Sequence, residues 1–143
     1  MLVIKLKTMK IPYVILVLFF VAVACTDQVM VPPVEYTPVT DIGKYNMKII
    51  PQPQTSADNI KLVMYDDCQY NLLDGVTRDG STISIEKHFN SMMKLPCMLR
   101  NDTIVIGKLP FGTYTVNYKL LDLSTAVTNP VSLAISFNLA VLK

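Results

Sequence analysis

The sequence predicts an all-β domain, an antiparallel two-sheet sandwich of six or seven strands. Apolar and polar residues alternate with a period of two along most of the chain, while the 3.6-residue period of amphipathic helices is nearly absent. Turn-forming pairs separate the alternating runs, namely Asp74-Gly75, Asp79-Gly80 and Asn129-Pro130. Short alternating strands favour antiparallel pairing, because parallel sheets buried on both faces contain continuous apolar strands.

The length of 143 residues allows one domain at most once a targeting segment is removed. With 13 Lys+Arg and 11 Asp+Glu, the formal net charge is only +2. The basic residues are scattered along the chain, so the sequence excludes the basic patch of a nucleic-acid-binding protein.

The N-terminal segment has the pattern of a secretory signal. Residues 1–10 carry three lysines and no acid, and residues 11–24 are apolar apart from Pro12 and Tyr13. A helix that crosses a bilayer needs roughly 20 apolar residues, so this stretch is short for a permanent anchor. We therefore expect residues 1–24 to be a cleaved signal peptide.

The segment ends in Ala22-Val23-Ala24-Cys25, which resembles the lipobox of bacterial lipoproteins. The resemblance implies that the thiol of Cys25 receives a diacylglycerol and that Cys25 becomes the N-terminus of the mature chain. Ala22 departs from the leucine most common at that position, and the alternative is an ordinary signal peptide or an uncleaved helix with an incidental cysteine. A lipoprotein with two or more acyl chains is stably anchored, so we expect export and attachment to a membrane, the outer one in preference to the inner.

Residues 25–43 follow as the lipidated cysteine and a proline-rich tether. Pro32, Pro33 and Pro38 favour extended backbone over helix. Alternatively, residues 34–40 form a first edge strand, where proline is tolerated. The β-sandwich domain is then expected over residues 44–143.

Six runs within this domain are expected to be strands. The clearest is Leu133 to Val141, in which five apolar side chains alternate with Ala, Ser and Asn. The others are Tyr114–Leu120 and Ile83–Phe89, and more weakly Tyr45–Ile50, Ile60–Tyr65 and Thr103–Ile106.

The motif formed by Leu109, Gly112 and Tyr114 resembles the L-x-x-G-x-Y turn into a strand of immunoglobulin-like and prealbumin-like sandwiches. The resemblance implies a structural corner in which the hydroxyl of Tyr114 bonds to backbone a few residues upstream. The alternative is a tight turn before any aromatic strand. Periodicity does not distinguish the immunoglobulin-like from the prealbumin-like strand order.

Cys68 and Cys97 are an even pair in a chain expected to be exported, which favours a disulfide. The alternative is two separately buried thiols. A bridge over this span is worth roughly 3 to 4 kcal/mol in the chain-entropy model, which would help a small core.

Few residues suggest chemistry. Asp66, Asp67, Asp74 and Asp79 fall in or beside one predicted loop and could hold calcium, but they do not match the EF-hand spacing, and we expect solvated turn acids and no metal. The single histidine, His88, is expected to face solvent. Zinc-ligand spacing, a nucleophile elbow and a phosphate loop are all missing from the sequence, so we expect no catalytic residue, no cofactor and no enzyme activity.

Two further features concern the surface. Met92, Met93 and Leu95 could form an adaptable apolar loop, although we expect them to fill the core beneath a loop. Asp102-Thr103-Ile104 resembles the motif at which some gut Gram-negative bacteria O-glycosylate exported proteins, which would modify Thr103.

Together, the lipobox, the tether and the corner resemble small immunoglobulin-like or prealbumin-like lipoproteins of Gram-negative gut bacteria. The resemblance implies a membrane-tethered, non-catalytic binding or structural module with a protein or glycan ligand. One alternative is a subunit of a surface assembly that pairs through its C-terminal strand, residues 132–143. Another is a glycan-capture accessory that uses the loop aromatics Tyr70 and Phe111.

Overall fold

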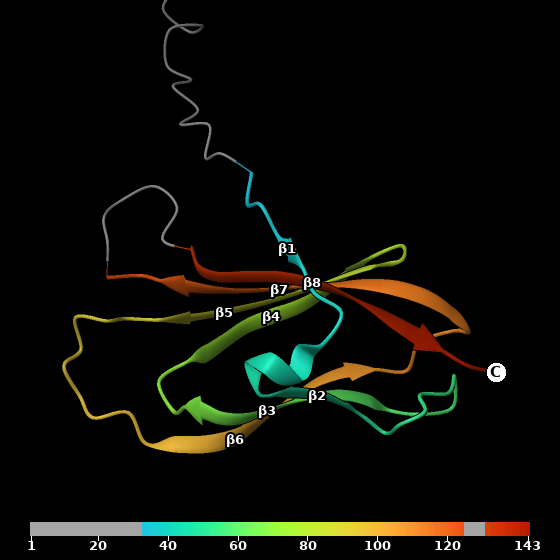
Figure 1. Cartoon of the computed structure of the whole chain (residues 1–143), viewed down its shortest axis with the longest axis horizontal. Coiled ribbons are helices and arrows are strands. Elements are labelled where there is room, and N and C mark those ends of the chain that lie inside the picture. The colour runs from blue at the N-terminus through green and yellow to red at the C-terminus, as the bar shows by residue number, and fades with distance from the viewer. Residues whose placement is uncertain (1–32, 125–130) are drawn as a thin grey trace, which may run out of the picture. The chain divides into compact units, whose positions relative to one another are not determined.

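The structure is a computed structural model, and it describes residues 33–124 and 131–143. The described residues form eight strands and one short 3-10 helix (Figure 1). The elements are β1 (Thr37–Pro38), η1 (Ile42–Tyr45), β2 (Met47–Ile50), β3 (Ile60–Cys68), β4 (Leu72–Asp79), β5 (Thr82–Phe89), β6 (Leu99–Gly107), β7 (Gly112–Asp122) and β8 (Val131–Val141).

The strands form two sheets, which confirms the all-β prediction. One sheet has five strands in the order β1-β8-β7-β5-β4, and the other has three in the order β2-β3-β6. Figure 1 shows the two sheets as separate layers. A single hydrophobic core takes side chains from both sheets, and its fully buried members include Ile60, Leu62, Ile85, Val116 and Val141.

The six predicted strands are all present, as β2, β3 and β5 to β8. The alternation that predicted β8 is seen in its burial, because Ile135, Phe137, Leu139 and Val141 are at most 6% exposed. Each of these residues lies two positions from the next, so all point to one face of the strand. The alternation of apolar and polar residues was therefore sufficient to predict a strand that has one buried face.

The expectation of purely antiparallel pairing is wrong for two pairs. β5 pairs in parallel with β7 over eight residues, and β1 pairs in parallel with β8. The chain between β5 and β7 returns through β6, which lies in the other sheet. This return in the opposite layer allows two strands of one sheet to run in the same direction without a crossover helix.

β4 was not predicted, and the turn expected at Asp74-Gly75 is wrong. Both residues lie inside β4, where the register with β5 shifts between Leu73 and Gly75, as at a β-bulge. The turn at Asp79-Gly80 is confirmed, because Gly80 has φ +57° in the two-residue connection between β4 and β5. Asn129-Pro130 lies outside the described residues.

The folded part begins before Gly43. Thr37 and Pro38 pair with Ile135 and Ser136 as an edge strand, within the range of the alternative to a simple tether. Val39 and Ile42 then pack against the core. Residues 1–24 and Cys25 lie outside the described residues. Within the described ranges, no helix is long and apolar enough to cross a membrane.

Candidate functional site

The most unusual side chain in the core is a lysine. On β5, Ile83 and Ile85 point into the core and are at most 1% exposed. Lys87 is the next residue on that face, since side chains two apart on a strand point the same way, and it is fully buried. A buried lysine is rare unless it is paired with an opposite charge.

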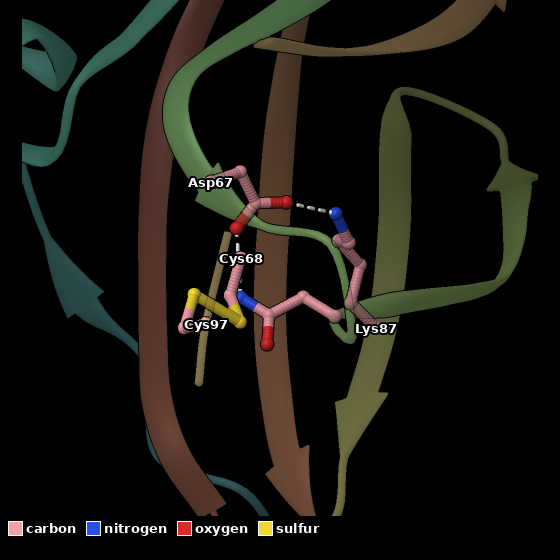
Figure 2. Close-up of a disulfide and its surroundings, with 5 residues drawn as sticks. Asp67, Cys68, Lys87 and Cys97 are labelled. Atoms are coloured by element: carbon pink, nitrogen blue, oxygen red, sulfur yellow. Dashed lines mark hydrogen bonds and ion pairs between the residues drawn. A yellow bond between two sulfur atoms is a disulfide. The ribbon is translucent and has the colours of Figure 1, made fainter. Parts of the chain in front are cut away.

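Two carboxylates from the opposite sheet provide that charge. Lys87 Nζ donates to Oδ2 of Asp67 on β3 and, at 2.7 Å, to Oδ2 of Asp102 on β6. The Asp67 side chain is 7% exposed and that of Asp102 is 27% exposed. Figure 2 shows the side chains of Lys87 and Asp67 pointing toward one another beside the Cys68–Cys97 disulfide.

A β-bulge points Asp67 toward Lys87. Ile60, Leu62 and Met64 face the core, so strict alternation would place Asp66 inward and Asp67 outward. The register with β6 shifts between Met64 and Asp67, and Asp66 adopts the left-handed conformation with φ 54°. The extra residue therefore leaves Asp66 exposed and directs Asp67 inward.

The remaining carboxylate oxygens of the cluster are also hydrogen-bonded. Asn71 Nδ2 donates to Oδ1 of Asp67 at 2.7 Å, and the Thr103 backbone N–H donates to Oδ1 of Asp102 at 2.9 Å. Burial alone would raise the pKa of Asp102, but Lys87, the Thr103 N–H and the charge of Arg100 together lower it. Asp102 is therefore held as the carboxylate.

Tyr118 lies near the same cluster on β7 and is 1% exposed. Burial raises the pKa of its hydroxyl, and the negative charges of Asp67 and Asp102 raise it further. Tyr118 therefore stays neutral and contributes to the apolar surroundings of the cluster.

The four acids considered for calcium do not come together. Asp67 is buried against Lys87 instead of being a solvated turn acid, and Asp74 contacts His88 (Oδ1 to Nδ1, 2.5 Å). Asp79 lies at the other end of β4. The described residues contain no group of three or more His, Cys, Asp or Glu side chains that could hold a metal ion. His88 lies on the face of β5 opposite Lys87, as expected for a solvent-facing imidazole, and its side chain is 25% exposed beside the exposed carboxylate of Asp74.

The disulfide between Cys68 and Cys97 is present, with a Cα–Cα distance of 5.5 Å. It joins the end of β3 to the residues just before β6. We call residues 90–98, which connect β5 to β6, the β5–β6 loop. The bridge and a hydrogen bond from Gln69 N to Met98 O hold one end of this loop.

The carboxylate of Asp122, at the end of β7, holds the other end of the loop. Its Oδ1 accepts hydrogen bonds from the backbone N–H groups of Ser91 (3.1 Å) and Ser124 (3.0 Å). Hydrogen bonds from these two serines lower the pKa of Asp122 well below its usual value. The Ser91 and Ser124 hydroxyls also lie 2.7 Å apart.

Between these attachments the loop is apolar and exposed. Met92 is 73% exposed, Met93 and Leu95 are each 51% exposed, and Met98 is 63% exposed. The expectation that these side chains fill the core is therefore wrong. Leu72 and Leu99, which flank the loop on β4 and β6, are also more than half exposed.

The L-x-x-G-x-Y motif lies at the start of β7. The Tyr114 hydroxyl donates to the Pro110 carbonyl at 2.9 Å, four residues upstream. Leu109 is buried, and Gly112 has φ +153°, which side chains rarely allow. Thr103 is exposed on β6, and its glycosylation stays a prediction.

The two loop aromatics considered for glycan capture lie far apart in the structure. Tyr70 lies in the turn after β3, whereas Phe111 lies just before β7, at the far end of β6. A nine-residue strand separates these ends by about 30 Å, so the two aromatics do not form one sugar platform.

The C-terminal strand β8 already has neighbours on both sides. It pairs with β7 along nearly its whole length. Its outer edge is bonded to β1 at Ile135 and Ser136, and Leu142 exchanges hydrogen bonds with Gln54 and Ser56. An added strand would have to displace these contacts.

Lys87, Asp67 and Asp102, which we call the Lys87 cluster, were not predicted to lie together, because charged residues on a strand are expected on its solvent-exposed face. The available signal was position, since Lys87 lies two residues after Ile85 on the apolar face of a predicted strand. Asp67 gave no signal, because the bulge that turns it inward has no sequence signature here.

Comparison of the chain with protein-family models, with curated proteins and with solved structures finds no match.

Proposed function

We propose that this chain is an exported, lipid-anchored, non-catalytic binding module that presents its β5–β6 loop to a protein partner. The exposed apolar loop carries the proposal. Four large apolar side chains, Met92, Met93, Leu95 and Met98, are at least half exposed on a loop held at both ends. Contiguous exposed apolar residues are typical of interaction sites.

The residue types favour a protein partner over a sugar. Methionine is flexible and polarisable, so it adapts to irregular apolar surfaces. Residues 90–98 contain no aromatic side chain on which a sugar ring could stack. The anchor is proposed from the lipobox-like Ala22-Val23-Ala24-Cys25, and the outer membrane is the proposed location.

Site-specific photocrosslinking in the native bacterium tests the loop. A photoreactive amino acid replaces Met93 in one variant and Phe111 in the control variant, which is 60% exposed at the opposite end of β6. We expect one discrete protein adduct at position 93, absent at position 111 and lost when Met92 and Leu95 are changed to Ser. No adduct at position 93, or the same adduct at position 111, would refute the proposed binding surface.

Fractionation tests the anchor separately. The wild-type protein should be found with membranes and be released only by detergent, whereas Cys25→Ala should lose lipid attachment. A Cys68→Ala variant is the control, since it removes a cysteine without touching the lipobox. Equal membrane retention of Cys25→Ala and wild type, at wild-type lipid content, would contradict the lipoprotein proposal.

A further inference from the structure

The Lys87 cluster is not explained by stability. A buried ion pair contributes little net stability, because desolvation offsets the attraction, and apolar residues of the same size are often as good or better. This cluster places one fully buried ammonium against two carboxylates, on the core face of β5 and near the buried Tyr118. The arrangement instead matches the requirements of a reaction between an amine and a carboxyl group.

We infer that Lys87 and Asp67 form an intramolecular isopeptide bond that links the two sheets covalently. Nζ of Lys87 contacts Oδ2 of Asp67, so it lies beside the carboxyl carbon to which that oxygen is bonded. Two groups held together in this way react as if at very high concentration. This inference does not depend on the proposed function.

Each neighbour has a position that suits one part of the reaction. Asn71 Nδ2 donates to Oδ1 of Asp67, where negative charge develops when the amine attacks the carboxyl carbon. Asp102 is held as a carboxylate with its Oδ2 at 2.7 Å from Lys87 Nζ, so it can accept a proton from the amine. Asp102 is also partly exposed, which gives the released water a path to solvent.

The step balances without a co-reactant. The ammonium of Lys87 first gives one proton to Oδ2 of Asp67, which leaves a neutral amine beside a neutral carboxyl group. The amine attacks Cγ of Asp67 to form the C–N bond, and Asp102 then takes a second proton from the nitrogen of the tetrahedral intermediate. Asp102 returns this proton to the departing hydroxyl, and the C–O bond breaks to release one water. An ammonium and a carboxylate thus become one neutral amide and one water, which also removes two buried charges.

The product would connect parts of the fold that the disulfide does not. Cys68–Cys97 joins β3 to the residues just before β6, a strand of the same sheet, whereas an Asp67–Lys87 bond joins β3 to β5 of the other sheet. The two bonds leave adjacent residues of β3. A digest must therefore be reduced before the two links can be told apart.

Intact mass of the purified full-chain product, after reduction, tests the inference. We expect wild-type protein to be lighter by one water than its processed sequence, and a tryptic digest to contain the peptide of Asp67 joined to that of Lys87. Asp102→Asn keeps the size of the side chain but removes the proton acceptor, so it should fold and show the full mass. Circular dichroism and formation of the disulfide establish that this variant is folded.

Lys119 and Glu86 supply an internal control, because they form a partly exposed ion pair of 2.5 Å and should remain unlinked. Folded wild-type protein at full mass, with trypsin cleaving after Lys87, would overturn the inference. So would a link from Lys87 to Asp102, or a link in Asp102→Asn equal to that in wild type.

Discussion

Removing the Cys68–Cys97 disulfide should lower the free energy of unfolding, because the bridge limits the conformational freedom of the unfolded chain. The bridge closes a loop across a sequence separation of 29 residues. The chain-entropy relation gives roughly 12 cal/mol/K for this loop, or about 3.6 kcal/mol at 25 °C. Cys97 is exposed and Cys68 only partly buried, so replacing both with Ala removes little packing. The measured loss should therefore come mainly from the unfolded state.

Urea unfolding of Cys68→Ala/Cys97→Ala, compared with the oxidised protein, measures this loss. The Cys25→Ser background in both proteins keeps the third cysteine out of disulfide exchange. We expect the free energy of unfolding to fall by about 3 to 4 kcal/mol, and m to rise because the unfolded chain expands. A loss below about 1 kcal/mol, with m unchanged, would show that the bridge does not constrain the unfolded chain.

Two further predictions concern the corner and the loop. Tyr114→Phe removes the 2.9 Å bond to the Pro110 carbonyl and should lower the free energy of unfolding by about 1 kcal/mol; thermal unfolding checks this, and an unchanged midpoint would contradict it. The hydrogen bonds from Ser91 and Ser124 stabilise the ionised form of Asp122 in the folded protein. Their contribution to the free energy of unfolding is therefore present above the ordinary aspartate pKa of about 3.9, and it is lost as the pH falls through the lowered pKa of the folded state. In an NMR acid titration the amide signals of both serines should move only well below pH 3.9. A titration midpoint at or above the ordinary pKa would contradict the proposed hydrogen bonds to Asp122.

The sequence predicted strands wherever one face is buried and the other is exposed. The alternation in β8 and β7 reflects burial on one face, which is a local property of each strand. β4 carries no such alternation, and its residues become a strand through pairing with β5. The Asp74-Gly75 pair was a reasonable turn signal that this pairing overrode.

Strand direction was not predictable in the same way. Whether β5 and β7 run in parallel depends on which sheet receives β6, and side-chain periodicity carries no information on that choice. The same limit applies to the sites. Lys87 could be placed on an apolar face, but its partners Asp67 and Asp102 come from the opposite sheet.

The residue types of the β5–β6 loop did not show whether its apolar side chains are buried or exposed. Met92 and Met93 are apolar, and apolar residues between strands usually cover the core. They face solvent on a loop whose ends are held by Asp122 and by the Cys68–Cys97 bridge. Those attachments involve residues distant in sequence.

We propose that a lipid on Cys25 holds this domain at a membrane. Intact mass of the protein extracted from its native membranes tests this anchor. We expect a mass that corresponds to residues 25–143 plus acyl chains, with Cys68 and Cys97 protected from alkylation until reduction. A mass that retains Met1 and carries no lipid would contradict it.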